Sequence, residues 1–329
     1  MRARRARTGS TIGDTLPDSP GVDPPVRLRL PTTTLEIPAG RPVLMGIVNA
    51  NDDSFSDGGR FSTLDAQVAH ALQLVADGAG IIDVGGESGV TDTAPRAPEE
   101  EAALVVPLVA RLVAEGVVVS VDTWKPPVAE AVLAEGASII NDVSGLRDPE
   151  LAAACARHGG ALVVMHTRVE PKHKVFPDYA DGVTADVESF LAERLDVARA
   201  AGVGDDQLIF DPGPDFAKTP AESIELLRAL PRLLGRFGLP VLLAVSRKDF
   251  VGALTSTAPR DRGPGTLAAV GEGVDAGAHI LRVHEVAATA QYLTVRAALR
   301  GELEVPADLS VPEHLRRQRV GPVTRTGES

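Results

Sequence analysis

Residues 117–122 read VVVSVD, a short run of β-branched side chains that ends in a carboxylate and is followed by a helix-like segment. Similar runs recur between residues 41 and 300. The full set is VLMGIVN (43–49), GIIDVGGE (80–87), VVVSVD (117–122), SIINDVS (138–144), ALVVMH (161–166), LIFDPG (208–213), VLLAVS (241–246) and HILRVH (279–284). Continuous Val/Ile/Leu runs bounded by Gly or Pro are typical of parallel strands that are buried on both faces.

The segments between these runs are rich in Ala, Leu, Glu and Arg and are long enough for crossover helices. We predict helices at 64–77, 99–115, 126–135, 184–201, 220–235 and 285–299. Glycines stand where such helices would end, at Gly78, Gly116, Gly136, Gly202 and Gly277. Strand–helix units repeated in this way predict an α/β protein, a single-domain (β/α)8 TIM barrel. A doubly wound open sheet is the alternative, but such sheets more often have about five to seven strands.

The domain organisation follows from where the repeat begins and ends. The 329 residues would suffice for two domains, but the repeat predicts one barrel at 41–300. Residues 27–40 predict a short N-terminal β-hairpin that closes one end of the barrel. Residues 1–26 and 301–329 are polar or rich in Pro and Arg, and predict a disordered N-terminal tail and a C-terminal tail. The Arg-rich start lacks the apolar segment of a secretory signal.

Composition excludes several classes of protein. The net charge of −12 argues against a nucleic-acid partner bound by phosphate neutralisation. No apolar run reaches the ~18 residues needed to cross a bilayer, so we expect no membrane partner. The one cysteine, Cys155, excludes an intrachain disulfide and a cysteine-rich metal site. We therefore expect a cytoplasmic globular protein, and an aromatic content of 3% requires an aliphatic core.

Polar side chains gather where each predicted strand ends. They are Asn49, Glu87, Asp122, Asn141, Asp142, His166, Asp211, Ser246, Arg247, Lys248, Arg282 and His284. In a barrel, these ends form the mouth where active sites lie. Carboxylates and amides can accept hydrogen bonds from a flat heterocycle, and cations can hold a phosphate or pyrophosphate. Because the cations follow the last two strands, the sequence predicts that they are grouped apart from the carboxylates.

The motifs resemble those of the dihydropteroate synthase family over residues 41–300. The matching stretches are MGIVNANDDSFSDGG (45–59), IIDVGGES (81–88), SVDTWK (120–125), INDVSG (140–145), VVMH (163–166), DPGPDFAK (211–218), SRKDFVG (246–252), GTLAA (265–269) and RVHEV (282–286). The resemblance implies a transferase of folate biosynthesis. In that reaction the arylamine of p-aminobenzoate displaces pyrophosphate from a dihydropterin diphosphate, with Mg²⁺ at the site, in an enzyme that is a homodimer.

The resemblance also implies roles for single residues. The pterin-binding set is Asp122, Asn141, Met165, Asp211, Phe216 and Lys248. Arg282 and His284 would hold the phosphates, and with Asp53 and Lys248 they form the implied catalytic set. Phe55 and Ser246 would face the arylamine, and Asn49 would contribute to the magnesium site. Carboxylates would favour the positive charge that develops on the methylene carbon, and cations would favour the leaving group. No side-chain nucleophile is required.

One loop departs from the family pattern. The family continues GGES with Thr-Arg-Pro-Gly, whereas this chain has Gly89-Val90-Thr91-Asp92. The missing arginine helps in the family to hold pyrophosphate and to order the loops around the second substrate. Three readings follow: a synthase with variant loops, a paralogue with another amine or pterin substrate, or a pterin-binding protein without synthase activity. The pterin barrels of corrinoid methyltransferases share the strand-end Asp and Asn residues, but the cations of 246–248 and 282–284 argue against them.

Overall fold

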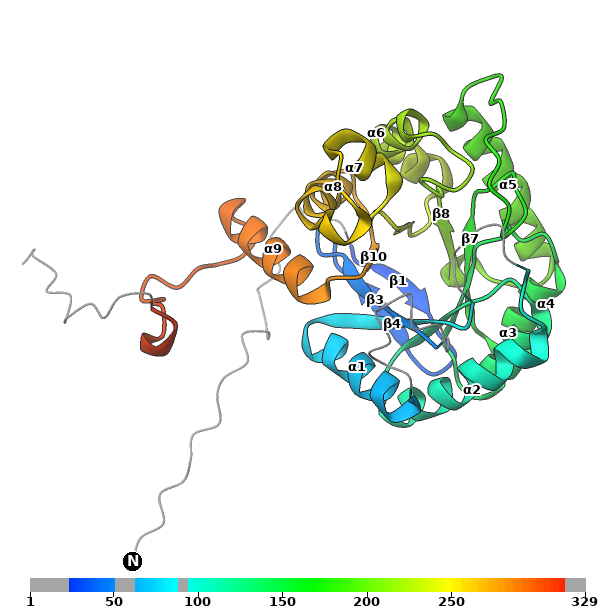
Figure 1. The fold of residues 1–329 in the computed structure, drawn as a ribbon, viewed down its shortest axis with the longest axis horizontal. Helices are drawn as coiled ribbons and strands as arrows, with labels where there is room; N and C mark the ends of the chain where they lie inside the picture. The colour runs from blue at the N-terminus through cyan, green and yellow to red at the C-terminus, as the bar shows by residue number, and fades with distance from the viewer. Residues whose placement is uncertain (1–23, 51–62, 88–93, 317–329) are drawn as a thin grey trace, which may run out of the picture.

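The computed structural model describes residues 24–50, 63–87 and 94–316. Within these residues, eight parallel strands form a ring surrounded by helices (Figure 1). The strands are β3 (Val43–Asn49), β4 (Ala79–Gly85), β5 (Val119–Asp122), β6 (Ile139–Asp142), β7 (Ala161–Met165), β8 (Leu208–Asp211), β9 (Leu242–Leu243) and β10 (Ile280–Val283). They pair in the order β8-β7-β6-β5-β4-β3-β10-β9, and a parallel bridge from Phe210 to Val241 closes the ring. The barrel is therefore confirmed and the open-sheet alternative is wrong.

Helices follow the strands in turn. They are α1 (Leu64–Ala76), α2 (Pro98–Ala114), α3 (Pro126–Ala134), α4 (Glu150–His158), α5 (Val183–Ala200), α6 (Pro220–Phe237), α7 (Asp249–Thr255), α8 (Gly263–Asp275) and α9 (Val286–Leu299), with short 3₁₀ turns η1 (Asp205–Gln207), η2 (Pro259–Asp261) and η3 (Glu313–Leu315). All six predicted helices are present. The glycines expected to end them have positive φ, which confirms their role as helix stops. Cys155 is buried in α4, and burial raises the pKa of its thiol to about 12.

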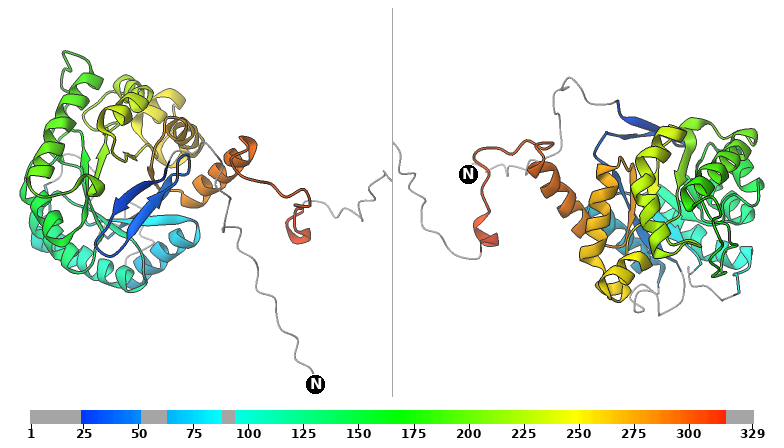
Figure 2. Two further views of the ribbon diagram at one scale, coloured as in Figure 1. Left: turned by 180° about the vertical axis from the view of Figure 1, so that it is seen from behind. Right: turned by 90° about the horizontal axis from the view of Figure 1, so that it is seen from above.

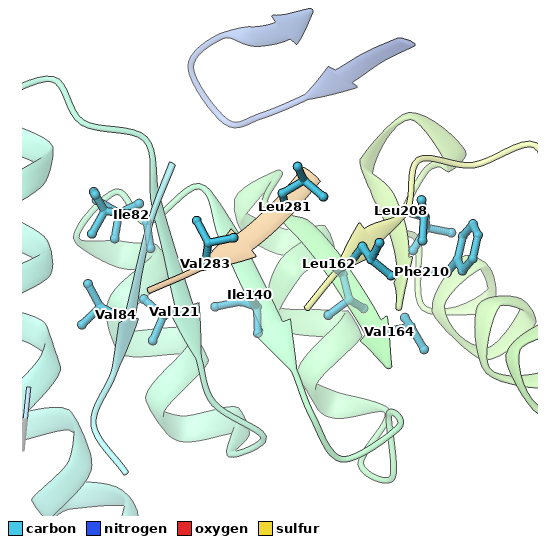
Figure 3. Close-up of a cluster of buried hydrophobic side chains, with 14 of the residues drawn as sticks. Ile82, Val84, Val121, Ile140, Leu162, Val164, Leu208, Phe210, Leu281 and Val283 are labelled. Carbon is cyan, nitrogen blue, oxygen red and sulfur yellow. The ribbon is translucent and has the colours of Figure 1, made fainter. Parts of the chain in front are cut away.

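An aliphatic shell fills the space between the strands and the helices. Figure 3 shows side chains that belong to it, including Ile82, Val84, Val121 and Ile140. Alternate residues of the same strands point the other way, because side chains alternate across a strand. The shell accounts for the low aromatic content, since Val, Leu and Ile fill this layer. In the described ranges, no helix is long and apolar enough to cross a membrane.

A hairpin lies across one end of the barrel (Figure 2). It consists of the antiparallel strands β1 (Val26–Arg29) and β2 (Thr34–Ile37). Leu28 and Ile37 are at most 1% exposed and pack with the interior side chains Met45, Ile139 and Ile209 in one cluster. The hairpin therefore closes the amino-terminal end of the barrel and leaves the carboxyl ends of the strands as the open mouth.

The predicted tails fall largely outside the described residues. Residues 1–23 and 317–329 are not among them, nor are the stretches 51–62 and 88–93. The described part of the C-terminal tail, 301–316, is exposed over most of its length and contains turns and η3.

Candidate active site

The alternation of side chains along the strands delivers polar groups to the barrel interior. Ile81, Ile139, Val163, Ile209 and Ile280 are interior side chains. Two residues further along the same strands are Asp83, Asn141, Met165, Asp211 and Arg282. Because side chains two apart point to the same face, these five converge beneath the mouth. All five except Arg282 are at most 3% exposed.

Arg282 lies at the centre of this polar layer. Its Nε donates to Asp83 Oδ2 at 2.6 Å, and its Nη2 donates to Asp122 Oδ2 at 3.0 Å. Asn141 Nδ2 donates to the same Asp83 oxygen at 3.2 Å. The expectation that cations stand apart from carboxylates is therefore wrong for Arg282. Its side chain comes from the interior face of β10, between acidic residues of β4 and β5.

Asp83 is a site residue that the strand-end pattern missed. It is fully buried, and its Oδ1 has no hydrogen-bond partner in the part of the chain that the structure describes. The signal that could have found it is its position two residues after Ile81 on the same strand. A buried carboxylate opposite a guanidinium fixes the position of that guanidinium, because breaking such a pair leaves an uncompensated charge.

Asp122 has an unusual acidity. Burial raises the pKa of its carboxyl group to about 7, although the Arg282 charge opposes the rise, and the nearby acidic groups Asp83 and Glu101 add to it. Its side chain is 23% exposed and lines the mouth. A carboxyl group with a pKa in this range changes its charge near neutral pH, so its hydrogen bonding to a ligand depends on pH.

Asp211 ends β8 and shapes the turn that follows. One carboxylate oxygen accepts the Gly213 N–H at 2.7 Å. Burial raises the pKa of Asp211, and the Gly213 N–H and the positive charges of Lys248 and Lys218 oppose that rise. The side chain is 3% exposed, which makes the carboxylate a fixed acceptor at the base of the mouth.

Lys218 holds the same turn from below, a role that no sequence pattern indicated. Its Nζ donates to the backbone oxygens of His166 (3.2 Å), Gly213 (2.9 Å) and Phe216 (2.9 Å). Burial lowers the pKa of Lys218 to about 7. The three bonds tie the segment after β7 to the segment after β8, and they position Phe216 at the mouth.

Substitution of Gly213 by alanine should disrupt this turn. Gly213 has φ +66°, and a Cβ atom there would lie 2.2 Å from the His166 backbone oxygen. We expect Gly213→Ala to lower the free energy of unfolding by about 1–3 kcal/mol. Gly238→Ala is the control, because Gly238 has φ +62° with open space around it. If chemical denaturation finds equal losses for both variants, the close approach to His166 contributes nothing to stability.

Two further contacts join the segments that follow β8, β9 and β10 at the mouth. Lys248 Nζ lies 4.3 Å from the centre of the Phe216 ring, a cation–π geometry. Ser246 Oγ lies 2.9 Å from His284 Nδ1 and accepts the His284 backbone N–H at 3.2 Å. The direction of the Ser246–His284 side-chain hydrogen bond depends on the imidazole tautomer. In the tautomer with the proton on Nε2, the Ser246 hydroxyl donates to Nδ1 and Nε2 can donate to a ligand.

His284 is neutral over the physiological range. Desolvation and the nearby charges of Arg247, Arg282 and Lys248 lower its pKa to about 3. An anion bound among these three cations would raise that pKa, because it would offset their charges. Arg247 itself has φ +60° and donates to Glu285 at 3.2 Å.

Two residues of the expected rim do not face the mouth. His166 is fully buried, and its Nε2 lies 2.8 Å from Asp186 Oδ1 on α5. Asp142 is also fully buried and accepts the backbone N–H groups of Ser144 (2.8 Å) and Leu146 (2.5 Å). Each follows an inward-facing residue by one position, so each points outward.

A cavity of about 700 Å³ occupies the mouth. The predicted site residues that line it are Asn49, Asp122, Phe216, Ser246, Lys248, Arg282 and His284. Asn141, Met165 and Asp211 are buried at the ends of their strands and are not among its lining residues. Asp53, Phe55 and the variant stretch 89–92 lie outside the described residues. The structure thus gathers most of the predicted site at one opening.

A buried ion-pair network flanks the cavity and was not predicted. Lys125 Nζ lies 2.6 Å from Glu87 and 2.5 Å from Glu101, and Lys172 Nζ lies 3.2 Å from Glu87. Burial opposes ionisation of Glu87, but the hydrogen bonds from Lys125, from the Arg96 backbone and from Lys172 keep its pKa below the usual value. Lys172 comes from the segment after β7, so this pair holds that segment across the mouth to the end of β4.

Comparison with known proteins agrees with this geometry. A family model described as pterin binding enzyme matches residues 45–284. The dihydropteroate synthase of Bacillus subtilis is 41% identical over 246 residues, which cover 74% of this chain and 84% of the relative. The Mycobacterium leprae enzyme is 43% identical over 265 residues, covering 78% of this chain and 92% of the relative.

Solved structures give the same result. The Xanthomonas albilineans dihydropteroate synthase with 4-aminobenzoic acid superimposes with a TM-score of 0.77 at 42% identity, covering 86% of this chain and all of that one. The same enzyme in complex with 7,8-dihydropteroate gives a TM-score of 0.73 over 84% of this chain. The chain belongs to the dihydropteroate synthase family. It is therefore a transferase with a pterin-binding barrel.

The resemblance to dihydropteroate synthases implies a Mg²⁺ ion at the site. Among the described residues, no group of three or more His, Cys, Asp or Glu side chains could hold a metal ion. Asn49 lines the cavity and has an amide oxygen. This oxygen lies beside Gly85, 3.7 Å from the point where a Cβ atom on that residue would stand. Mg²⁺ keeps several waters and commonly takes substrate phosphate oxygens. An ion held mainly by the substrate would need few protein ligands, and the Asn49 amide oxygen could serve as one of them.

Proposed function

We propose that this protein condenses (7,8-dihydropterin-6-yl)methyl diphosphate with 4-aminobenzoate and releases pyrophosphate, a step of folate biosynthesis. The observation that carries the proposal is one cavity of about 700 Å³ that is lined by the acceptor Asp122 and by the cations Lys248 and Arg282. A ligand with a polar ring at one end and a diphosphate at the other satisfies both kinds of group.

The pterin end of the substrate would bind in the buried half of the site. Asp122, Asn141 and Asp211 provide acceptors for ring N–H groups, and charge-assisted bonds of this kind are the strong ones. Phe216 offers an aromatic face beside the ring, with Met165 buried at the end of β7. Lys248, stacked on Phe216, adds a donor for the ring.

The diphosphate end would bind at the cations. In the reaction the C–O bond to the diphosphate breaks, the amine nitrogen forms a bond to the methylene carbon, and the amine loses a proton to solvent. Arg282, and His284 in the tautomer that carries its proton on Nε2, would stabilise the negative charge on the departing pyrophosphate. Mg²⁺, held by Asn49 and the phosphates, would supply further charge compensation. From the first loop, Asp53 would belong to the catalytic set and Phe55 would face the arylamine.

The acidity of Asp122 gives the proposal a pH signature. The raised pKa of about 7 means that Asp122 stabilises the unliganded fold below pH ~4 and that this contribution is lost as the pH rises through 7. Pterin affinity should change in the opposite direction and strengthen up to about tenfold between pH 6 and 8, since the ionised carboxylate is the acceptor. Calorimetric titration of wild type and Asp122→Asn checks this. The same pH slope in both proteins would assign the titration to another group.

The location and the oligomeric state of the protein belong to the same proposal. We place the protein in the cytoplasm, where its small-molecule substrates occur. We also propose a homodimer, because α9 carries Val295 and Leu299 at 56% and 84% exposure and only Val286 and Thr289 of this helix are buried. Light scattering at several protein concentrations tests the homodimer. A monomer at all concentrations would refute it.

A paralogue that uses another amine is the second candidate, favoured by the sequence departure at 89–92. We expect mass spectrometry to identify dihydropteroate when the enzyme, Mg²⁺ and dihydropterin diphosphate are incubated with 4-aminobenzoate. A product only with a different amine from a panel would favour the paralogue. Tight pterin binding without a product from any amine would support a binding protein that lacks synthase activity.

A further inference from the structure

The segment that follows β7 forms one wall of the cavity at the mouth. Residues 167–173 are here called the β7 wall, and all of them except Arg168 line this cavity. The wall begins directly after Met165 and His166, and the His166 N–H donates to the Asp211 backbone oxygen at 2.9 Å. It therefore starts beside Met165 and Asp211, two of the residues that the proposed function assigns to the pterin.

The root of the β7 wall is fixed to helix α5. Arg168 donates to Asp186 through Nε and through Nη2, each at 2.9 Å, and His166 Nε2 lies 2.8 Å from the same carboxylate. Forked contacts between a guanidinium and a carboxylate fix orientation as well as distance. We therefore expect the root to stay in place when a residue at the other end of the wall is replaced.

The far end of the β7 wall is a tight turn with an unusual residue. The His173 N–H donates to the Glu170 backbone oxygen at 3.2 Å, so Pro171 and Lys172 are the two central residues. Lys172 has φ +72°. Proline at the first central position and a positive φ at the second are typical of a type II turn, which favours Gly or Asn at the second. The turn itself therefore does not explain the lysine.

A buried ion pair with Glu87 does explain it. Lys172 Nζ lies 3.2 Å from a Glu87 carboxylate oxygen, and both side chains are 6% exposed. Glu87 is also held by Lys125 Nζ at 2.6 Å and by the Arg96 backbone N–H at 3.1 Å. A buried pair compensates for the loss of water only in good geometry. The pair therefore fixes the distance between the end of the β7 wall and the end of β4.

The charge balance around Glu87 indicates that Lys172 acts by position. Lys125 contacts the carboxylates of both Glu87 and Glu101. Without Lys172, Glu87 would still be paired with Lys125, so its buried charge would keep a partner. What would be lost is the connection between the β7 wall and β4.

We propose that Lys172 is a positioning residue that seats the β7 wall against the end of β4 and so forms the pterin end of the cavity before the substrate binds. The inference rests on the proposed function and concerns the affinity of the same site for its pterin substrate. If only the seated wall is competent to bind, a wall that is seated for a tenth of the time lowers the apparent affinity about tenfold.

Lys172→Gly tests the proposal, because glycine keeps the turn and removes the ion pair. We expect the Kd for dihydropterin diphosphate to rise about tenfold, measured by calorimetry without amine, and KM to rise with it. The value of kcat should stay within about twofold, since bound substrate holds the wall in place and the reacting groups are unchanged. Lys172→Arg, which keeps a cation of similar reach, should bind within about threefold of wild type.

Ser256→Gly is the matched control for the backbone. Ser256 has φ +56°, is exposed at the end of α7 and is not among the lining residues of the cavity. Glycine relieves the same kind of backbone conformation there, so this variant should bind dihydropterin diphosphate within about twofold of wild type. A tenfold loss in this control would assign the effect to glycine itself and overturn the role of Lys172.

A double variant separates position from charge. Lys172→Gly combined with Glu87→Gln should bind no more weakly than the weaker of the two single variants, because the two residues act through one contact. Losses that multiply would mean that the residues act independently. Recovery to wild-type affinity would mean that an uncompensated charge weakened binding. Either result overturns the proposal.

The remaining outcomes distinguish this inference from the proposed function. Wild-type affinity in Lys172→Gly, or a fall in kcat at unchanged Kd, overturns the positioning role and leaves the proposed function intact. If wild type binds dihydropterin diphosphate but releases no pyrophosphate, the proposed function fails, and the calorimetric affinities alone decide the role of Lys172. A wild-type protein that does not bind dihydropterin diphosphate contradicts both.

Discussion

The Asp211→Asn variant should bind dihydropterin diphosphate about 10- to 150-fold more weakly than wild type. The amide keeps an oxygen for the Gly213 N–H, which the carboxylate accepts at 2.7 Å, so the turn is preserved. What is lost is the charge in a hydrogen bond to a ring N–H, and a hydrogen bond to a charged group contributes about 1.5–3 kcal/mol. Isothermal calorimetry of the unreacted complex, without amine, measures the difference.

The matched control for Asp211 lies near the other end of the same strand. Asp205 is in η1, just before β8, and pairs with Arg199 at the surface. Asp205→Asn should leave the pterin affinity within about twofold, because exposed ion pairs contribute little. If Asp211→Asn binds as tightly as wild type, Asp211 is not a pterin ligand and the assignment of the buried half of the site is wrong.

Replacement of Arg282 should have the largest effect on catalysis. We expect Arg282→Gln to lower kcat/KM by about 10²–10³, the range found when one donor to a developing negative charge is removed. The variant should also lose stability, because Asp83 at 0% exposure would keep a charge without its partner. Pyrophosphate release and chemical denaturation measure the two effects separately.

A second substitution separates the effect of Arg282 on the reaction rate from its effect on stability. Adding Asp83→Asn to Arg282→Gln removes the unpaired buried charge, and we expect stability to recover while the rate stays low. Arg282→Lys keeps the charge but loses the forked geometry, and should fall between wild type and Arg282→Gln. Arg296→Gln, which breaks a pair with Asp275 at the end of α8, is the control with little expected change in rate. Wild-type kcat/KM in Arg282→Gln would remove Arg282 from the catalytic set.

The barrel could be predicted because its signal is local and repeated. Each strand is a short apolar run, and the glycines after the helices adopt the positive φ that a helix end favours. The strand 241–246 is the exception, since regular pairing covers only Leu242–Leu243. The chain leaves the sheet before Ser246, and the turn places Arg247 at φ +60°. A run of apolar residues in the sequence does not show at which residue the regular pairing of the strand ends.

The side-chain alternation explains both the successes and the errors at the site. Asn141 and Met165 lie two residues after interior side chains and belong to the inward layer. Asp142 and His166 are one residue further and face outward, although the end of an apolar run placed them with the site. Asp83 was missed for the converse reason, because it lies inside its apolar run and not at its end.

Other contacts depend on segments that are distant in sequence. Lys172 reaches Glu87 across the mouth from the segment after β7, and no periodicity relates the two. Lys218 turns inward because three backbone oxygens converge on it, an arrangement set by the turn after β8. Such contacts can be recognised only in the folded structure, whereas the motifs can be recognised in the sequence alone.

Pyrophosphate release is the measurement that tests the proposed function most directly. Wild-type protein should be mixed with Mg²⁺ and dihydropterin diphosphate, and release should be followed with and without 4-aminobenzoate. We expect sustained release, one pyrophosphate for each dihydropteroate formed, only when the amine is present. No release above the amine-free rate, from protein that binds the pterin diphosphate, would contradict the proposal that this mouth joins the two substrates.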